Sequence, residues 1–197
     1  MKNDIPHLDF PIIDAHVHLY PDALAPKAVP ALSERFGNAP AFNGTVSECV
    51  QNAAEAGIAL SINLPVATTP EHVRHTNTFW AQYATKKSVG ESAVMSLAAL
   101  HPKTPDAANE VCNIARMGFA GIKFHPEYQD FRFIDACMDN IWTAMSENGP
   151  PIFTQAANAY LRLHSTRHPL RFLNYIAVSR SSRLPPRIWA DLACGTR

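Results

Sequence analysis

The segment Pro11-Ile12-Ile13-Asp14-Ala15-His16-Val17-His18 decides the fold that we expect for this chain. Its apolar start and Val17 favour a buried β-strand near the N-terminus. Side chains two apart on a strand point to the same face, so His16 and His18 project side by side, as does Asp14. Two such imidazoles can bind one divalent metal ion, and Asp14 can hold a ring N–H or a nearby backbone group. The alternative is a pair of ordinary histidines near a strand end.

Further apolar segments alternate with helical ones along the first 155 residues. Strands are expected at 58–64, 94–100 and 119–124, and a fifth strand begins at 151. Thr45-x-x-Glu48 is typical of a capping box that opens a helix to Ala56. Thr69-Pro70-Glu71 favours a helix that runs to about Lys87. This alternation predicts parallel βα units, that is, an α/β fold.

Two motifs carry a resemblance to a known family. The segment from Ile13 to His18 resembles the first-strand signature of the amidohydrolase superfamily, and Gly121-Ile122-Lys123-Phe124-His125-Pro126 is similar to a strand-four segment of its amidohydrolase-related branch. The resemblance implies a metal-dependent TIM-barrel hydrolase or decarboxylase. It implies His16, His18 and His125 as metal ligands and Lys123 and His125 as catalytic residues. The implied cofactor is a divalent metal ion, with zinc expected.

Other strand ends offer further candidates and alternatives. The second strand ends near Asn63 and Pro65. The third ends at His101, which we expect to be a loop residue beside its proline; the alternative is a residue that lines the site. The alternative for Lys123 is a structural charge that pairs with an acid such as Glu127 or Asp130, because a buried lysine is costly when it is unpaired.

The chain is short for a complete barrel, which takes about 250 residues. Because the chain has 197 residues, we expect an incomplete TIM (β/α)8 barrel with about the first four to five βα units. The expected domain covers 1–166, and an Arg-rich tail covers 167–197. The resemblance also implies a strand-five histidine, where this chain has Gln155, and later His and Asp ligands without a counterpart in the tail. A frameshift or truncation between Gln155 and Arg180 would explain this; the alternative is a basic tail that binds an anionic partner.

Composition narrows the class of protein. Hydrophobic residues make up 47% and charged residues 17%, and the net charge is zero, which gives no sign of nucleic-acid binding. No apolar run approaches the roughly 20 residues of a membrane span, and the N-terminus lacks the features of a signal peptide. The four cysteines are widely spaced, which indicates reduced thiols and a cytoplasmic protein. Unpaired edges at the first and fifth strands make a homo-oligomer possible.

The expected function is metal-dependent hydrolysis or decarboxylation of a small carbonyl substrate, impaired by the missing ligands. The alternative is a catalytically inactive barrel fragment or a binding module. A phosphoesterase of the histidinol-phosphatase type shares a similar His-x-His start, but the segment from Gly121 to Pro126 does not fit that class.

Overall fold

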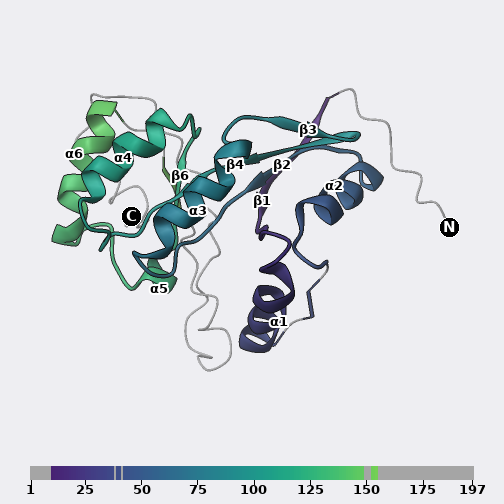
Figure 1. Cartoon of the computed structure of the whole chain (residues 1–197), viewed down its shortest axis with the longest axis horizontal. Helices are drawn as coiled ribbons and strands as arrows, with labels where there is room; N and C mark the ends of the chain where they lie inside the picture. The colour runs from purple at the N-terminus through teal and green to yellow at the C-terminus, as the bar shows by residue number, and fades with distance from the viewer. Residues whose placement is uncertain (1–9, 38, 41, 149–151, 155–197) are drawn as a thin grey trace, which may run out of the picture. The chain divides into compact units, whose positions relative to one another are not determined.

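The computed structural model describes residues 10–37, 39–40, 42–148 and 152–154. They divide into two compact units (Figure 1). Unit 1 comprises the residues up to Pro65 together with Phe79–Leu97, and unit 2 comprises Val66–Thr78 together with the residues from Ala98 onward. The predicted Arg-rich tail at 167–197 and Gln155 lie outside the described residues.

Unit 1 is built on a four-stranded sheet in the order β1-β2-β4-β3. Strands β1, β2 and β4 run parallel, and β3 pairs antiparallel with β4. The elements are β1 (Ile12–Val17), α1 (Ala25–Phe36), α2 (Val46–Glu55), β2 (Ile58–Asn63), the 3₁₀ helix η1 (Ala81–Tyr83), β3 (Lys87–Val89) and β4 (Ser92–Ser96). The predicted parallel pairing of the first strands is confirmed.

Strand β1 lies at the edge of this sheet, and its pairing with β2 is irregular. Asp14 pairs with Ser61 and Val17 pairs with Asn63, so the register shifts between Asp14 and Val17. Such a bulge changes the direction in which nearby side chains point. The bulge includes His16, one of the two histidines predicted to bind a metal ion.

Helix α2 begins as the capping motif predicts. The hydroxyl oxygen of Thr45 accepts a hydrogen bond from the main-chain N–H of Glu48 at 3.4 Å. The carboxylate of Glu48 accepts from the main-chain N–H of Asn43 at 2.9 Å, rather than from Thr45 itself. The helix then packs on β2 and β4 through buried residues that include Cys49 and Val50.

The prediction of one helix from 69 to about Lys87 is wrong in its second half. Helix α3 (His72–Trp80) ends early, η1 follows, and Lys87 lies in β3. Gly90, with a φ of 63°, and Glu91 form the two-residue turn of a hairpin that joins β3 to β4. Residues 87–89 are a strand because they pair with β4. The helix-start motif at Thr69-Pro70-Glu71 is local and holds no information about that pairing.

Unit 2 contains a parallel sheet in the order β5-β6-β7. Its further elements are β5 (Ala98–Ala99), α4 (Ala107–Arg116), β6 (Ile122–Phe124), α5 (Pro126–Gln129), the 3₁₀ helix η2 (Ala136–Met138), α6 (Asp139–Asn148) and β7 (Ile152–Thr154). Helices α4 and α6 pack against each other, as Figure 1 shows. Phe124, Phe131, Phe133 and Trp142 form an aromatic cluster beside β6.

The predicted α/β class with mostly parallel strands is confirmed. The predicted strand at 94–100 is divided, because Leu97 donates to Asn63 of unit 1 whereas Ala98 donates to Gly121 of unit 2. Both sheets are open among the described residues, which show no closure into a barrel. No helix in the described part of the chain is both long and apolar enough to cross a membrane.

Candidate metal site

His16 and His18 form a close pair at the carboxyl end of β1. Their Nε2 atoms lie 3.2 Å apart, and their rings meet edge to face with centroids 4.9 Å apart. Both side chains are exposed, so solvent and small ions reach them. The prediction that the two imidazoles share one face is confirmed, and the structure brings their outer nitrogens together. We call them the histidine pair.

A main-chain carbonyl fixes the tautomer of His18. Its Nδ1 atom lies 2.9 Å from the carbonyl oxygen of Leu64, at the end of β2. A carbonyl oxygen can only accept, so Nδ1 carries the hydrogen and donates it. In the neutral ring Nε2 then carries the lone pair, as in histidines that bind a metal ion through Nε2 while Nδ1 donates to a carbonyl.

The spacing of the histidine pair fits a metal ion. Two nitrogens bound to one tetrahedral zinc ion at about 2.0–2.1 Å lie roughly 3.3 Å from each other. The Nε2 atoms are 3.2 Å apart. The separation of the pair therefore matches that of two ligands in one zinc coordination sphere.

Asp14 supports the main chain rather than a ring. Its Oδ1 atom accepts a hydrogen bond from the main-chain N–H of His16 at 3.1 Å. This contact bridges the bulge in β1 through the main chain of His16. Of the two roles predicted for Asp14, it has the one that involves a backbone group.

Two buried polar side chains hold the segment that follows His18. The Oδ1 atom of Asn63 accepts from the main-chain N–H of Leu19 at 2.8 Å, and its Nδ2 atom donates to the hydroxyl of Ser96 at 3.0 Å. That hydroxyl donates its single hydrogen to the carbonyl of Leu97 at 3.0 Å. Asn63 and Ser96 are both fully buried. The sequence placed Asn63 at a strand end, but nothing in it indicated these partners.

In unit 2, Lys123 lies in the middle of β6. It pairs with Ala99 of β5 and Phe153 of β7, and only 1% of it is exposed. Burial lowers the pKa of its ammonium group from 10.5 to about 8. The lysine is thus buried, and it can release a proton near neutral pH.

His125 follows β6 and is also buried. Its ring stacks on Tyr128 with centroids 4.0 Å apart and planes 3° from parallel. Gln129 accepts from the main-chain N–H of His125 at 2.8 Å and donates to the carbonyls of Ala67 and Leu100 at 2.9 and 2.7 Å. This buried amide therefore ties together the chain segments at 67, 100 and 125. No pattern in the sequence marks Gln129, and its role follows only from its burial and its partners.

His101 is a buried loop residue of unit 2. Its Nδ1 atom accepts from the main-chain N–H of Lys103 at 3.1 Å, in the turn before α4. Burial lowers its pKa, and the charge of Lys103 adds to the effect. The expectation of a loop position is confirmed, and the contact gives the ring a structural role.

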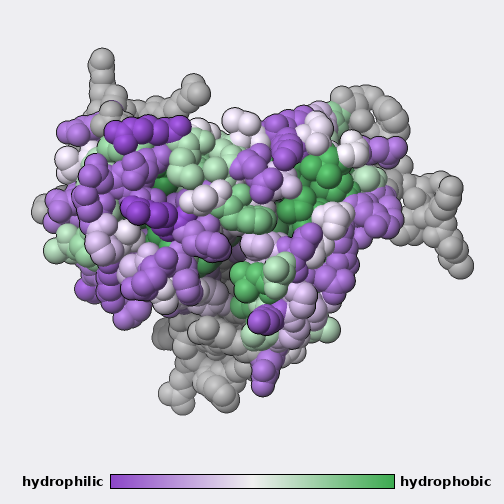
Figure 2. Space-filling view, viewed as in Figure 1, coloured by the Kyte–Doolittle hydropathy of each residue, from purple (hydrophilic) through white to green (hydrophobic). Residues whose placement is uncertain are grey.

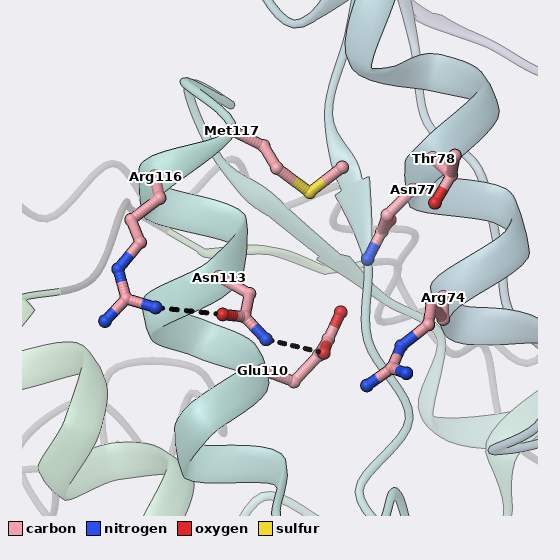
Figure 3. A pocket seen from close by; sticks show the side chains of 7 residues that line it. All are labelled: Arg74, Asn77, Thr78, Glu110, Asn113, Arg116 and Met117. Carbon is pink, nitrogen blue, oxygen red and sulfur yellow. Dashed lines mark hydrogen bonds between the residues drawn. The ribbon is translucent and has the colours of Figure 1, made fainter.

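A hollow of about 300 Å³ lies between α3 and α4 in unit 2 (Figure 3). Asn113 donates to Glu110 at 3.3 Å and accepts from Arg116 at 3.0 Å, and the amide of Asn77 is directed to the main chain of Ala99. The hydrogen bonds of Asn113 stay within α4, and those of Asn77 go to the main chain, so the polar groups of Asn113 and Asn77 already have partners. The other lining residues are Arg74, Thr78 and Met117.

The predicted site residues thus fall into two groups. The histidine pair belongs to unit 1, whereas Lys123 and His125 belong to unit 2. No cluster of three or more His, Cys, Asp or Glu side chains suited to a metal ion occurs among the residues that the structure describes. The assignment of His125 as a third ligand stays a prediction.

Comparisons with known proteins add no family. A scan against protein-family models gives no match to this sequence, and a search of curated proteins finds none that is similar to it.

Proposed function

We propose that the chain is a metal-dependent protein of the hydrolase or decarboxylase type, whose histidine pair binds a divalent ion, with zinc expected. The observation that supports it most is the 3.2 Å separation of the two Nε2 atoms, with Nδ1 of His18 donating to Leu64. A bound divalent ion would polarise the carbonyl of a small substrate or lower the pKa of a water molecule. The resemblance of two motifs to the amidohydrolase-related branch is consistent with this chemistry.

In this proposal the fold is the first part of a (βα)8 barrel. Parallel pairing in sequence order supports it, as β1-β2-β4 in unit 1 and as β5-β6-β7 in unit 2. Lys123 is proposed as a proton-transfer group, because a pKa of about 8 is close to the working pH that general acids and bases require. His125 is proposed as a metal or substrate contact.

Metal binding is the first test. We expect the wild-type chain to bind zinc in isothermal titration calorimetry and the His16→Ala/His18→Ala variant to lose that binding. The matched control is His72→Ala/His75→Ala, which removes two exposed histidines one helical turn apart on α3 and should leave binding at the histidine pair intact. Equal zinc binding by the wild type and the His16→Ala/His18→Ala variant would exclude the site.

Turnover separates the proposal from its alternative, a binding module without catalysis. The zinc-loaded and manganese-loaded chains are assayed against small amides, esters, lactones and aromatic acids. Metal-dependent turnover that the His16→Ala variant lacks would support the enzyme. Zinc binding without any turnover on this panel would favour the binding module.

A further inference from the structure

The chain leaves the β1–β2 ladder just before His18, one of the two members of the histidine pair. The last ladder pair of β1 is Val17 with Asn63, and the carbonyl of Val17 accepts from Leu64 at 2.9 Å. His18 lies one residue beyond this pair. The position of its main chain therefore depends on contacts outside the β ladder.

The Asn63 side chain supplies such a contact, and the direction of its amide is determined. The hydroxyl of Ser96 has one hydrogen, which it donates to Leu97, so it must accept from the amide of Asn63. The NH₂ group of Asn63 hence faces Ser96, and its oxygen faces the N–H of Leu19 at 2.8 Å. This chain of hydrogen bonds runs from β4 through β2 to the residue after His18.

The end of β2 also supplies the hydrogen-bond acceptor for the ring of His18. Asn63 precedes Leu64, whose carbonyl accepts from Nδ1 of His18 at 2.9 Å. The main-chain carbonyl of Asn63 in turn accepts from Leu97 at 3.0 Å. The end of β2 therefore fixes both the main chain after His18 and the tautomer of its ring.

We propose that Asn63, oriented by Ser96, is a positioning residue that keeps the histidine pair in its metal-binding geometry. This inference rests on the proposed function, because it assigns a role toward the metal that the pair would hold. Groups that orient metal-binding histidines typically contribute about 10- to 100-fold in metal affinity.

Asn77 provides a matched control for Asn63. Asn63 and Asn77 are both buried, at 0% and 1% exposure, and each side chain makes two hydrogen bonds. Asn77 belongs to unit 2, where both of its bonds go to the main chain of Ala99. Asn63→Ala and Asn77→Ala therefore remove equivalent buried amides, and only the first supports the histidine pair.

The test compares zinc dissociation constants, measured by calorimetry on the full chain carrying His72→Ala and His75→Ala. We expect Asn63→Ala to weaken binding about 10- to 100-fold and Asn77→Ala to leave it unchanged, although both lower Tm. An Asn63→Ala chain with wild-type affinity would overturn the inference alone. So would an Asn77→Ala chain that loses as much affinity. A parent chain that binds no more zinc than its His16→Ala/His18→Ala derivative would overturn the proposed function and this inference together.

A second variant and a second measurement cover a failure of Asn63→Ala to fold. Ser96→Ala keeps the Asn63 amide but removes the hydroxyl that orients it, so we expect a smaller loss of affinity. Long-range ¹H–¹⁵N NMR of the histidines, without zinc, should show His18 with its hydrogen on Nδ1 in the wild type and a mixture of tautomers in Ser96→Ala. Wild-type affinity together with the wild-type tautomer in Ser96→Ala would refute the positioning role.

Discussion

Lys123 is a cation enclosed by its own sheet, and its protonation makes the stability of unit 2 depend on pH. Burial lowers its pKa in the folded chain from 10.5 to about 8. Between these values the unfolded chain binds more protons than the folded chain, so the free energy of unfolding rises with pH there. Below about pH 8 the full cost of the buried charge is present, and above pH 10.5 it is gone.

Replacing Lys123 by methionine should remove this cost. Because one pKa unit corresponds to 1.36 kcal/mol, Lys123→Met should be more stable than the wild type below pH 8 by at most about 3 kcal/mol. The difference should shrink toward zero between pH 8 and pH 10.5, as measured by urea unfolding across that range. The exposed Lys103→Met serves as the control and should show no such trend. A Lys123→Met difference that does not vary with pH would contradict the assignment.

The histidine pair shows how far single residues could be predicted. The two-residue period of a strand places His16 and His18 on one face, and this needs no knowledge of the rest of the chain. Their 3.2 Å contact depends in addition on the bulge after Asp14 and on the carbonyl of Leu64, 46 residues from His18. Those are tertiary contacts, so the sequence pattern could not contain them.

Among the elements, the short helix α5 has a structural role out of proportion to its length. Its last residue, Gln129, satisfies three main-chain groups, at Ala67, Leu100 and His125. All three hydrogen bonds are buried, so their loss would leave main-chain polar groups with neither a protein partner nor water. Helix α5 thus joins segments that are far apart in the sequence, including the one that carries His125.

Gln129→Ala should therefore destabilise the chain strongly. We expect a loss of about 2–4 kcal/mol in the free energy of unfolding, measured with urea, because buried polar groups without partners cost about 1–3 kcal/mol each. Gln51→Ala on α2 is the control, since it removes an exposed contact to Glu55 and should cost less than about 0.5 kcal/mol. A loss in Gln129→Ala no larger than in Gln51→Ala would show that water replaces the amide.

The elements that sequence reasoning placed well are those with local signals. The capping motif at Thr45 and Glu48 fixed the start of α2, because its partners are within a few residues. The helix expected up to Lys87 and the strand expected at 94–100 were placed wrongly in part. In both segments the hydrogen-bond partners decide the conformation. Lys87 lies in a strand because it pairs with β4, and the second strand is divided because Leu97 donates to Asn63 whereas Ala98 donates to Gly121.

At the scale of the molecule, β1 concerns association, because it is an edge strand of its sheet among the described residues. Phe10 and Ile13 are 65% and 52% exposed, and Figure 2 shows hydrophobic residues at the surface around the strands and α2 of unit 1. An edge strand with apolar side chains and unpaired main-chain groups can pair with another chain. This agrees with the prediction that the first strand is an open edge.

Ile13→Lys should reduce self-association of the chain. A lysine on an edge strand opposes pairing with a second copy, so sedimentation velocity at increasing concentration should show less oligomer than for the wild type. Ile134→Lys is the control, because Ile134 is 69% exposed but lies in unit 2, outside any strand. A wild-type chain that stays monomeric at high concentration would contradict the prediction.

The overall class was accessible from the sequence, because alternating apolar and helical segments of this length predict parallel βα units. The division into two compact units was not, because it depends on which strands share a sheet. Closure of the proposed barrel is also beyond local sequence patterns, because it requires the first and last strands of the barrel to pair with each other.

The spacing of the histidine pair has a thermodynamic consequence. His16 and His18 are neighbours along the chain, so an ion that bridges only them closes almost no loop and removes little entropy from the unfolded state. The unfolded chain can chelate the same ion, and ligands that bind both states stabilise folding weakly. The preference of zinc for the folded chain is then limited to the roughly 10- to 100-fold that the positioning by Asn63 supplies, so zinc at this pair alone should raise Tm by no more than about ten degrees at saturation. A large rise, measured by calorimetric scanning with and without zinc, would reveal a further ligand distant in sequence. The His125→Ala chain would then show whether that ligand is His125.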